Sequence, residues 1–250
     1  MTRAGAVRLA VIASTVALLE ATCRLGLVGR QAVIAPSEMV LGAWRALGTD
    51  DVRRDLFATL GTVAQALVLA LVAGVAAGVV LHRLPRLRRA LDPFLASYYA
   101  IPTFVFYPLF IVLFGLNRWP LVAIGFLFAV VAVAINTLDG LSRVPRALLR
   151  TAQVMKLSPA QTLVHVTVPA AAPWLFTGAK FAVAYSFIGV IAGEFVQSGS
   201  GMGHAIAFAY NSFDNRTMYG LMIVLFGIVG TLNMGLWSWE RRLYARRGGA

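Results

Sequence analysis

Charged residues and cysteine are both scarce in this chain of 250 residues. Only 13% of the residues are Asp, Glu, Lys or Arg, whereas a soluble domain usually carries about 25%. The single cysteine, Cys23, excludes an intramolecular disulfide and a cysteine-cluster metal site. Hydrophobic residues make up 59% of the sequence, and the mean hydropathy is +0.78. This composition excludes a disordered chain, a fibrous repeat and most soluble enzymes, and it favours an integral membrane protein.

The sequence also lacks the motifs of several chemistries. No Gly-x-x-x-x-Gly-Lys-Ser/Thr pattern occurs, so we expect that the chain does not hydrolyse ATP itself. His82, His165 and His204 are scattered, without the clustered carboxylates that a metal site would need. No Ser/His/Asp set indicates nucleophilic catalysis, and no dense Lys/Arg stripe indicates nucleic-acid binding. These absences predict a chain that is not an enzyme, holds no cofactor and does not bind nucleic acid.

Six segments are apolar enough to cross a membrane, which takes about 20 residues as a helix. They are residues 9–28, 56–81, 93–116, 119–138, 170–193 and 217–239. The first contains Glu20 and Arg24, which are four residues apart and therefore pair along one helix face. No clear small-residue cleavage site follows it, so we interpret it as a retained transmembrane helix and not as a signal peptide. The predicted fold class is an all-α integral membrane protein with six transmembrane helices.

Basic residues predict the orientation of these helices. The termini and the loops after the second and fourth segments carry fourteen Lys and Arg residues, whereas the other side carries seven. Cytoplasmic loops are enriched in Lys and Arg, so both termini are predicted to be cytoplasmic. Residues 30–55 are then external, with a turn at Pro36 followed by a short amphipathic helix over 38–47.

Glycine and proline predict how two of the segments behave. Gly74-x-x-x-Gly78 is typical of a helix face that approaches a neighbour closely. Pro102 and Pro108 remove backbone hydrogen bonds from the segment 93–116. Such breaks occur in a kinked helix or beside a water-lined pathway, and the sequence leaves both interpretations open.

The loop segment, residues 139–169, has mixed polarity and its own helical signals. Pro145 suits the start of a helix, and no breaker follows before residue 155. Ser158 is then predicted to cap a second helix, with Pro159 in its first turn and Gln161 completing a capping box. Pro169 is predicted to stop that helix. The sequence therefore predicts two short helices that are joined by a turn, end at Pro169 and lie at the membrane surface.

The second half of the loop segment resembles the EAA loop of ABC importer permeases. That signature runs Glu-Ala-Ala, three residues, Gly, nine residues and Ile-x-Leu-Pro, and the spacing from Arg150 to Pro169 is the same. Other stretches that resemble the family are Leu91-Asp92-Pro93, Ile101-Pro102, Tyr107-Pro108-Leu109, Phe114-Gly115-Leu116, residues 136–140, Gly193-Glu194, residues 199–203 and residues 240–243. The most similar subgroup handles sulfonates, taurine, nitrate or pyrimidine precursors of thiamine.

The resemblance implies a function and a set of partners. Two permease copies, simplest as a homodimer, would form the pathway for a small polar or anionic solute in the bacterial inner membrane. Two separate ATPase subunits would bind ATP and Mg, and a periplasmic or lipid-anchored binding protein would deliver the solute. The residues implied to contact the ATPase are Arg150, Thr151, Ala152, Gln153, Lys156, Ser158 and Pro169. The predicted organisation is an N-terminal helix with an external segment (1–55), a permease core (56–242) and a basic tail (243–250).

Departures from the signature raise two questions. Arg150 stands where the family has Glu, which inverts the charge offered to the ATPase, and a compensating acidic residue in the partner or simple solvent exposure would both explain it. Lys156 stands where the family has Gly, at a position that could require a left-handed turn residue. The alternative to an importer permease is an ATP-independent secondary transporter or channel, which gives no reason for the loop segment, and an intramembrane enzyme is more distant still.

Four residues are candidates for lining the pathway: Phe104, Tyr107, Asn136 and Glu194. Ionisable groups at membrane depth are usually functional. Glu194 lies at the end of a predicted span, however, which favours a role as a helix cap or an anchor between helices. For the two aromatic residues, contact with the core or with lipid is favoured over a place in the pathway, and Asn136 either lines the pathway or bonds across helices.

Overall fold

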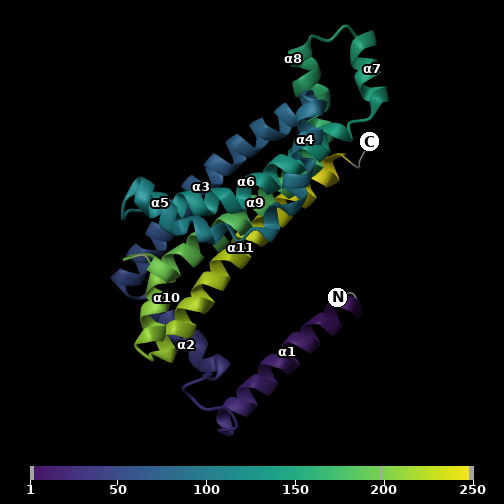
Figure 1. The fold of residues 1–250 in the computed structure, drawn as a ribbon. Coiled ribbons are helices and arrows are strands. Elements are labelled where there is room, and N and C mark those ends of the chain that lie inside the picture. Colours follow the sequence, from purple (N-terminus) through teal and green to yellow (C-terminus); the bar gives the residue numbers. More distant parts are fainter. Residues whose placement is uncertain (1–2, 198, 248–250) are drawn as a thin grey trace. The chain divides into compact units, whose positions relative to one another are not determined.

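The computed structural model describes residues 3–197 and 199–247, and every regular element in these ranges is helical. The elements are α1 (Arg3–Arg24), α2 (Pro36–Leu47), α3 (Asp50–Arg83), α4 (Pro85–Ser97), η1 (Tyr98–Ala100), η2 (Thr103–Phe106), α5 (Tyr107–Phe114), α6 (Trp119–Ser142), α7 (Arg146–Val154), α8 (Pro159–Thr162), η3 (Leu163–Thr167), α9 (Val168–Gln197), α10 (Met202–Asn211) and α11 (Asn215–Arg247). Figure 1 draws these elements and labels the α-helices among them. The predicted tail 243–250 is helical as far as Arg247, and residues 248–250 lie outside the described part.

Five stretches of the described residues are long and apolar enough to cross a membrane. They are Gly5–Arg24, Asp50–Arg83, Trp119–Ser142, Pro159–Val196 and Asn215–Arg241. A sixth span results if the bent pair Pro85–Ala100 and Thr103–Phe114 is counted as one. The prediction of an all-α membrane protein is therefore confirmed.

The segment 93–116 differs from a single helical span. Its two halves meet at an angle of 90°. Pro102 precedes a 3-10 turn in a non-helical conformation (φ −70°, ψ 84°), whereas Pro108 lies in the first turn of α5, where a missing N–H costs little. Pro102 is therefore the break, and the Tyr98 hydroxyl fixes it to α6 by donating to the Leu127 carbonyl over 2.8 Å.

The chain divides into two compact units. Unit 1 comprises Met1–Thr59 and Glu194–Thr231, and unit 2 comprises Leu60–Gly193 and Leu232–Ala250. Helices α3, α9 and α11 have residues in both.

Helix α6 supplies much of the core of unit 2. Ala129 and Val133 of this helix pack with Ala70 of α3 and Ala182 of α9, all at most 2% exposed. A Cβ atom on Gly74 would lie 2.5 Å from the Val133 Cβ atom, and one on Gly78 would lie 2.5 Å from the Thr137 Cβ atom. The predicted close approach at Gly74-x-x-x-Gly78 is confirmed, and its partner is α6.

Unit 1 joins α2 to the first turns of α11. A Cβ atom on Gly42 would lie 2.7 Å from the Arg216 carbonyl oxygen, so the two helices cross with backbone close to backbone. The predicted amphipathic helix over 38–47 is confirmed as α2, which begins two residues earlier at Pro36. The predicted pair on α1 is also present, because Arg24 Nε lies 2.6 Å from Glu20 Oε1. Glu20 additionally accepts hydrogen bonds from the amide and hydroxyl of Ser37.

Candidate functional site

The loop segment connects the end of α6 to the beginning of α9 in unit 2. Figure 1 shows α7 and α8 extending beyond the end of α6. Helix α7 begins after Pro145, whose extended conformation (φ −59°, ψ 129°) ends the turn from α6. Its Ala152 is 2% exposed and is the buried contact of the helix. One side of α7 is therefore held by the protein, while most of its surface is open.

The turn after α7 forces Lys156 into a left-handed conformation. Its φ is +52°, and the amide of Leu157 donates to the Ala152 carbonyl across the turn. A left-handed residue with a Cβ atom costs roughly 1–2 kcal/mol, a penalty that glycine avoids. The interpretation that this position requires a left-handed residue is confirmed. Lys156 adopts that conformation with a strained backbone.

The second helix begins with the predicted capping box. The amide of Gln161 donates to Ser158 Oγ over 3.2 Å, and the Ser158 amide donates to Gln161 Oε1 over 2.8 Å. Each side chain thereby satisfies an amide at the helix N-terminus that has no intrahelical partner. This prediction is confirmed in both halves.

The prediction that Pro169 stops the second helix is wrong. Pro169 is the second residue of α9, and the π-helical turn η3 leads directly into that helix. A proline ring in an α-helix collides with the carbonyl four residues earlier. The wider π turn, in which the Val168 amide donates to the Leu163 carbonyl five residues back, relieves this collision. The loop segment is therefore continuous with a membrane span at its C-terminal end.

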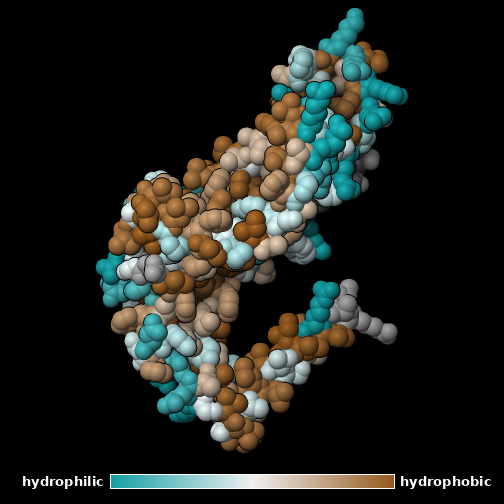
Figure 2. All heavy atoms as spheres, in the orientation of Figure 1, coloured by the Kyte–Doolittle hydropathy of each residue, from teal (hydrophilic) through white to brown (hydrophobic). Residues whose placement is uncertain are grey.

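The exposed surface of the loop segment is both apolar and basic. Val154 is 82% exposed and Met155 is 66% exposed at the end of α7. Arg146, Arg150 and Lys156 are also exposed. Figure 2 shows hydrophilic side chains gathered at this end of unit 2, where α7 and α8 lie in Figure 1. Exposed apolar side chains among charged ones are typical of a protein-binding surface.

Three candidate pathway residues lie in unit 2 and have internal contacts. Tyr107 is 4% exposed, stacks on Phe104 with ring centroids 5.4 Å apart, and packs with Leu121 and Ile124. Asn136 donates to the Ala132 carbonyl of its own helix over 2.8 Å. The structure brings the two aromatic residues together in the core, and the pathway assignment of all three stays a prediction.

The fourth candidate, Glu194, belongs to unit 1 and is 2% exposed. Both of its carboxylate oxygens lie within 2.9 Å of the Thr59 hydroxyl. Glu194 Oε2 also accepts from the Gly203 amide over 3.0 Å. This geometry is that of an anchor between helices, one of the two interpretations that the sequence left open.

Glu194 is one of three acceptors that cap helix α10. The amides of Gly201, Met202 and Gly203 donate to Asp55 Oδ1, Thr59 Oγ1 and Glu194 Oε2, over 2.9, 2.8 and 3.0 Å. Asp55, Thr59 and Glu194 are named here the α10 cap. Sequence reasoning missed Asp55 and Thr59, which lie 146 and 143 residues from the amides whose hydrogen bonds they accept. The only local signal was the glycine run, where Gly201 has a φ of +101°.

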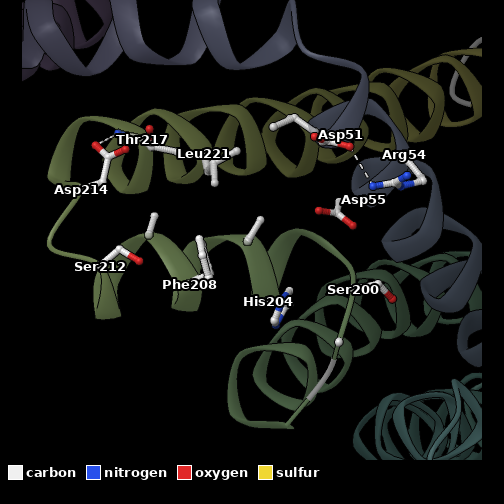
Figure 3. Close-up of a pocket in the computed structure, with 14 residues that line it drawn as sticks. Asp51, Arg54, Asp55, Ser200, His204, Phe208, Ser212, Asp214, Thr217 and Leu221 are labelled. Carbon is white, nitrogen blue, oxygen red and sulfur yellow. Dashed lines mark hydrogen bonds and ion pairs between the residues drawn. The ribbon is translucent and has the colours of Figure 1, made fainter.

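A pocket of about 600 Å³ lies beside the α10 cap in unit 1. Figure 3 shows His204 and Phe208 of α10 facing it, with Asp214 at one end and Asp55 at the other. Its carboxylates already have partners, because Asp51 pairs with Arg54 at 2.8 Å and Asp214 accepts from the Thr217 amide at 3.1 Å. Hydrogen bonds from the side chain and the amide of Thr217 hold the pKa of Asp214 below its usual range. No group of three or more His, Cys, Asp and Glu residues could hold a metal ion in the described ranges.

Lys180, which lies within the predicted span 170–193, has an acidic partner in unit 2. Its Nζ lies 2.7 Å from Glu240 Oε2. The neighbouring rings of Phe176 and Trp239 contact edge to face at 5.0 Å. The pair joins α9 to α11, so Lys180 has a structural contact.

Comparison with known proteins gives consistent matches. Residues 67–247 match the family described as binding-protein-dependent transport system inner membrane component. The nitrate import permease protein NrtB of Leptolyngbya laminosa is 30% identical over 213 residues, covering 82% of this chain and 76% of that protein. The taurine transport system permease protein TauC of Escherichia coli is 27% identical, covering 76% and 69%. The formylaminopyrimidine transport permease protein ThiX of Halalkalibacterium halodurans is 28% identical, covering 73% and 76%.

A similar fold occurs among solved structures. A chain of the MetNI methionine ABC transporter in an inward-facing conformation superposes with a TM-score of 0.66. The match covers 77% of this chain and 95% of that chain at 19% sequence identity. At this identity the likeness concerns the fold.

Proposed function

Because the chain belongs to the family of binding-protein-dependent transport system inner membrane components, and is thus a permease subunit of an ABC importer, we propose that its loop segment couples it to a separate ATPase. Members of the family work with an ABC ATPase and a substrate-binding protein. The ATPase would bind ATP and Mg, and the chain described here would supply the pathway through the membrane.

The observation that carries this proposal is the exposed end of α7. Val154 and Met155 present apolar surface to solvent at 82% and 66% exposure. Burying a side chain of this size is worth about 1.5–3 kcal/mol, which gives a soluble partner a reason to bind there. The continuity from α8 through η3 into α9 supports the coupling role, because motion of the docked segment would move a membrane span as a rigid body.

The orientation and assembly follow as parts of the same proposal. Fourteen Lys and Arg residues on the side of the termini and the loop segment favour a cytoplasmic location for that side. Two copies of the chain would enclose one pathway, with two ATPases on the cytoplasmic side and the binding protein opposite. The solutes given in the names of NrtB, TauC and ThiX are nitrate, taurine and formylaminopyrimidine, respectively. They support a small polar or anionic solute for this chain.

Co-purification of the tagged permease with its cognate ATPase tests the proposal. The test variant carries Val154→Asp and Met155→Asp, which place charges on the exposed end of α7 without touching the buried Ala152. Leu84→Asp is the matched control, because Leu84 is 51% exposed and lies between α3 and α4, outside the loop segment and on the same side of the predicted topology. We expect the ATPase to co-purify with the wild type and the control and to be lost from the test variant.

The opposite result would favour the ATP-independent transporter. If no ATPase co-purifies with permease that is monodisperse in detergent, the loop segment has no coupling role. If the test variant retains the ATPase at wild-type affinity, the coupling surface lies elsewhere on the chain.

A further inference from the structure

The loop segment is strongly basic after its first residue. Between Asp139, which begins the segment, and Glu194, near the end of α9, the chain has no Asp or Glu, whereas it has Arg143, Arg146, Arg150, Lys156 and Lys180. We propose, on the basis of the coupling role proposed above, that the loop segment docks into an acidic groove of the ATPase, with Arg146 and Arg150 facing carboxylates and Val154 filling an apolar floor.

The three residues named in this proposal lie on one face of α7 and are called here the α7 stripe. Arg146, Arg150 and Val154 are separated by four residues each in α7, so their side chains follow one another along the helix. Ala152 is buried at 2% exposure, so α7 is held by a different face. The α7 stripe therefore presents two cations and then an apolar end to whatever covers it.

The cations of the α7 stripe have no internal partner. No ion pair joins Arg146, Arg150 or Lys156 to another residue within 3–197 and 199–247. Two other cations of unit 2 do have carboxylate partners, because Arg88 pairs with Asp92 and Lys180 pairs with Glu240. The guanidinium groups of α7 are thus available to an outside carboxylate, which they bind in bidentate fashion.

Helix α7 is also electrostatically unfavourable on its own. Arg146 lies in the first turn, where the helix dipole disfavours a cation, and that turn has no acidic residue. Arg146 and Arg150 are like charges four residues apart, and their repulsion destabilises the helix. An acidic partner would offset both effects, since its carboxylates would lie at the positive end of the helix.

Anionic lipid headgroups would also attract these arginines, but the geometry favours a protein. Val154 ends the α7 stripe at 82% exposure, and α7 and α8 extend past the end of α6 (Figure 1). A lipid surface contacts both the charged and the apolar side chains only of a helix that lies in the interface plane. Because α7 extends past the end of a predicted span, a groove with charged walls and an apolar floor fits both parts of this surface better.

Charge reversal at Arg150 tests the polarity of the contact. The affinity of the full-length permease for its cognate ATPase is measured in neutral-lipid nanodiscs for wild type, Arg150→Gln and Arg150→Glu. We expect Arg150→Glu to weaken binding about tenfold or more and Arg150→Gln to weaken it less, because reversal adds repulsion to the lost attraction. Arg86→Glu is the matched control, an exposed arginine of α4 on the same side of the predicted topology, and it should leave the affinity unchanged.

Rescue completes the test. An acidic residue of the ATPase that crosslinks to position 150 is changed to Lys, and this change should restore the binding of Arg150→Glu. Wild-type or tighter binding by Arg150→Glu would overturn the acidic groove, while loss of binding by Val154→Asp would leave the coupling role standing. An effect of Arg150→Glu that appears only in anionic lipid would assign the arginines to lipid and would also overturn the proposal.

Discussion

The α10 cap and the loop segment both contain several polar or charged groups. Those of the α10 cap are hydrogen-bonded inside the protein, whereas the basic groups of the loop segment face solvent. In the α10 cap, three consecutive amides meet three side-chain acceptors, and Glu194 is 2% exposed. In the loop segment, Arg146 and Arg150 are exposed and Val154 is 82% exposed. A closed network of this kind fixes helices in place, whereas an open surface with unpaired charge remains available to a partner. Burial and pairing, more than residue type, thus separate a structural site from a docking site in this chain.

Removing the Glu194 carboxylate should have the largest effect on stability. Glu194→Ala leaves the Thr59 hydroxyl and the Gly203 amide without their acceptor in a buried site. The expected loss is about 2–5 kcal/mol, because each unpaired buried group keeps its desolvation penalty. The thermal unfolding midpoint of detergent-solubilised permease measures this loss. Asp51→Ala, which removes an exposed carboxylate of the same unit, is the control and should change the midpoint little.

If Glu194→Ala unfolds at the wild-type temperature, the proposed contrast between a structural α10 cap and an open loop segment is contradicted. The buried carboxylate would then not hold α10, and the interpretation of Glu194 as a pathway residue would gain weight.

A methyl group at Gly201 should have the next largest effect. Gly201 has a φ of +101°, and its missing Cβ atom would meet the Glu194 carboxyl group. Gly201→Ala should therefore cost about 2 kcal/mol through backbone strain and displacement of the cap. Gly199→Ala is the control, since a Cβ atom there meets nothing within 4 Å. Equal midpoints for the two variants would show that the cap tolerates displacement.

The contrast between the two regions also explains what could be predicted from the sequence. The capping box at Ser158 and the pair on α1 were predictable because each joins residues three or four apart, and local spacing determines such contacts. The spans and the close face at Gly74 follow equally from hydrophobic runs and glycine spacing.

Contacts between distant residues were not predictable in this way. The bond between Thr59 and Glu194 spans 135 residues, and no local pattern distinguishes Thr59 from Thr62, the other threonine of its segment. The error at Pro169 had another cause. Proline normally ends a helix, and the π turn before Pro169 allows the helix to continue here.

Removing the backbone strain at Lys156 should stabilise the loop segment. Lys156 holds a φ of +52°, so Lys156→Gly should stabilise the turn by about 1 kcal/mol. Arg150→Gly, in the helical part of the segment, should destabilise α7 by about 1 kcal/mol. Hydrogen exchange of the α7 amides in the solubilised permease measures both changes. Slower exchange in Lys156→Gly and faster exchange in Arg150→Gly are expected, and the same direction in both would contradict the role of the turn.

The smallest effect is expected at Asp214, where α11 begins. The Thr217 amide and side chain hydrogen-bond to its carboxylate and lower its pKa in the folded state. The stability that this group contributes is therefore fully present above its unfolded pKa and is lost as the pH falls through the lower folded value. Asp214→Ala should cost about 1 kcal/mol at pH 7, as loss of a helix cap does. The difference in unfolding midpoint between wild type and variant should stay constant from pH 7 to pH 5 and shrink only under strongly acidic conditions. A difference that already disappears near pH 6 would mean that a group other than the Asp214 carboxylate determines the stability of this end of α11.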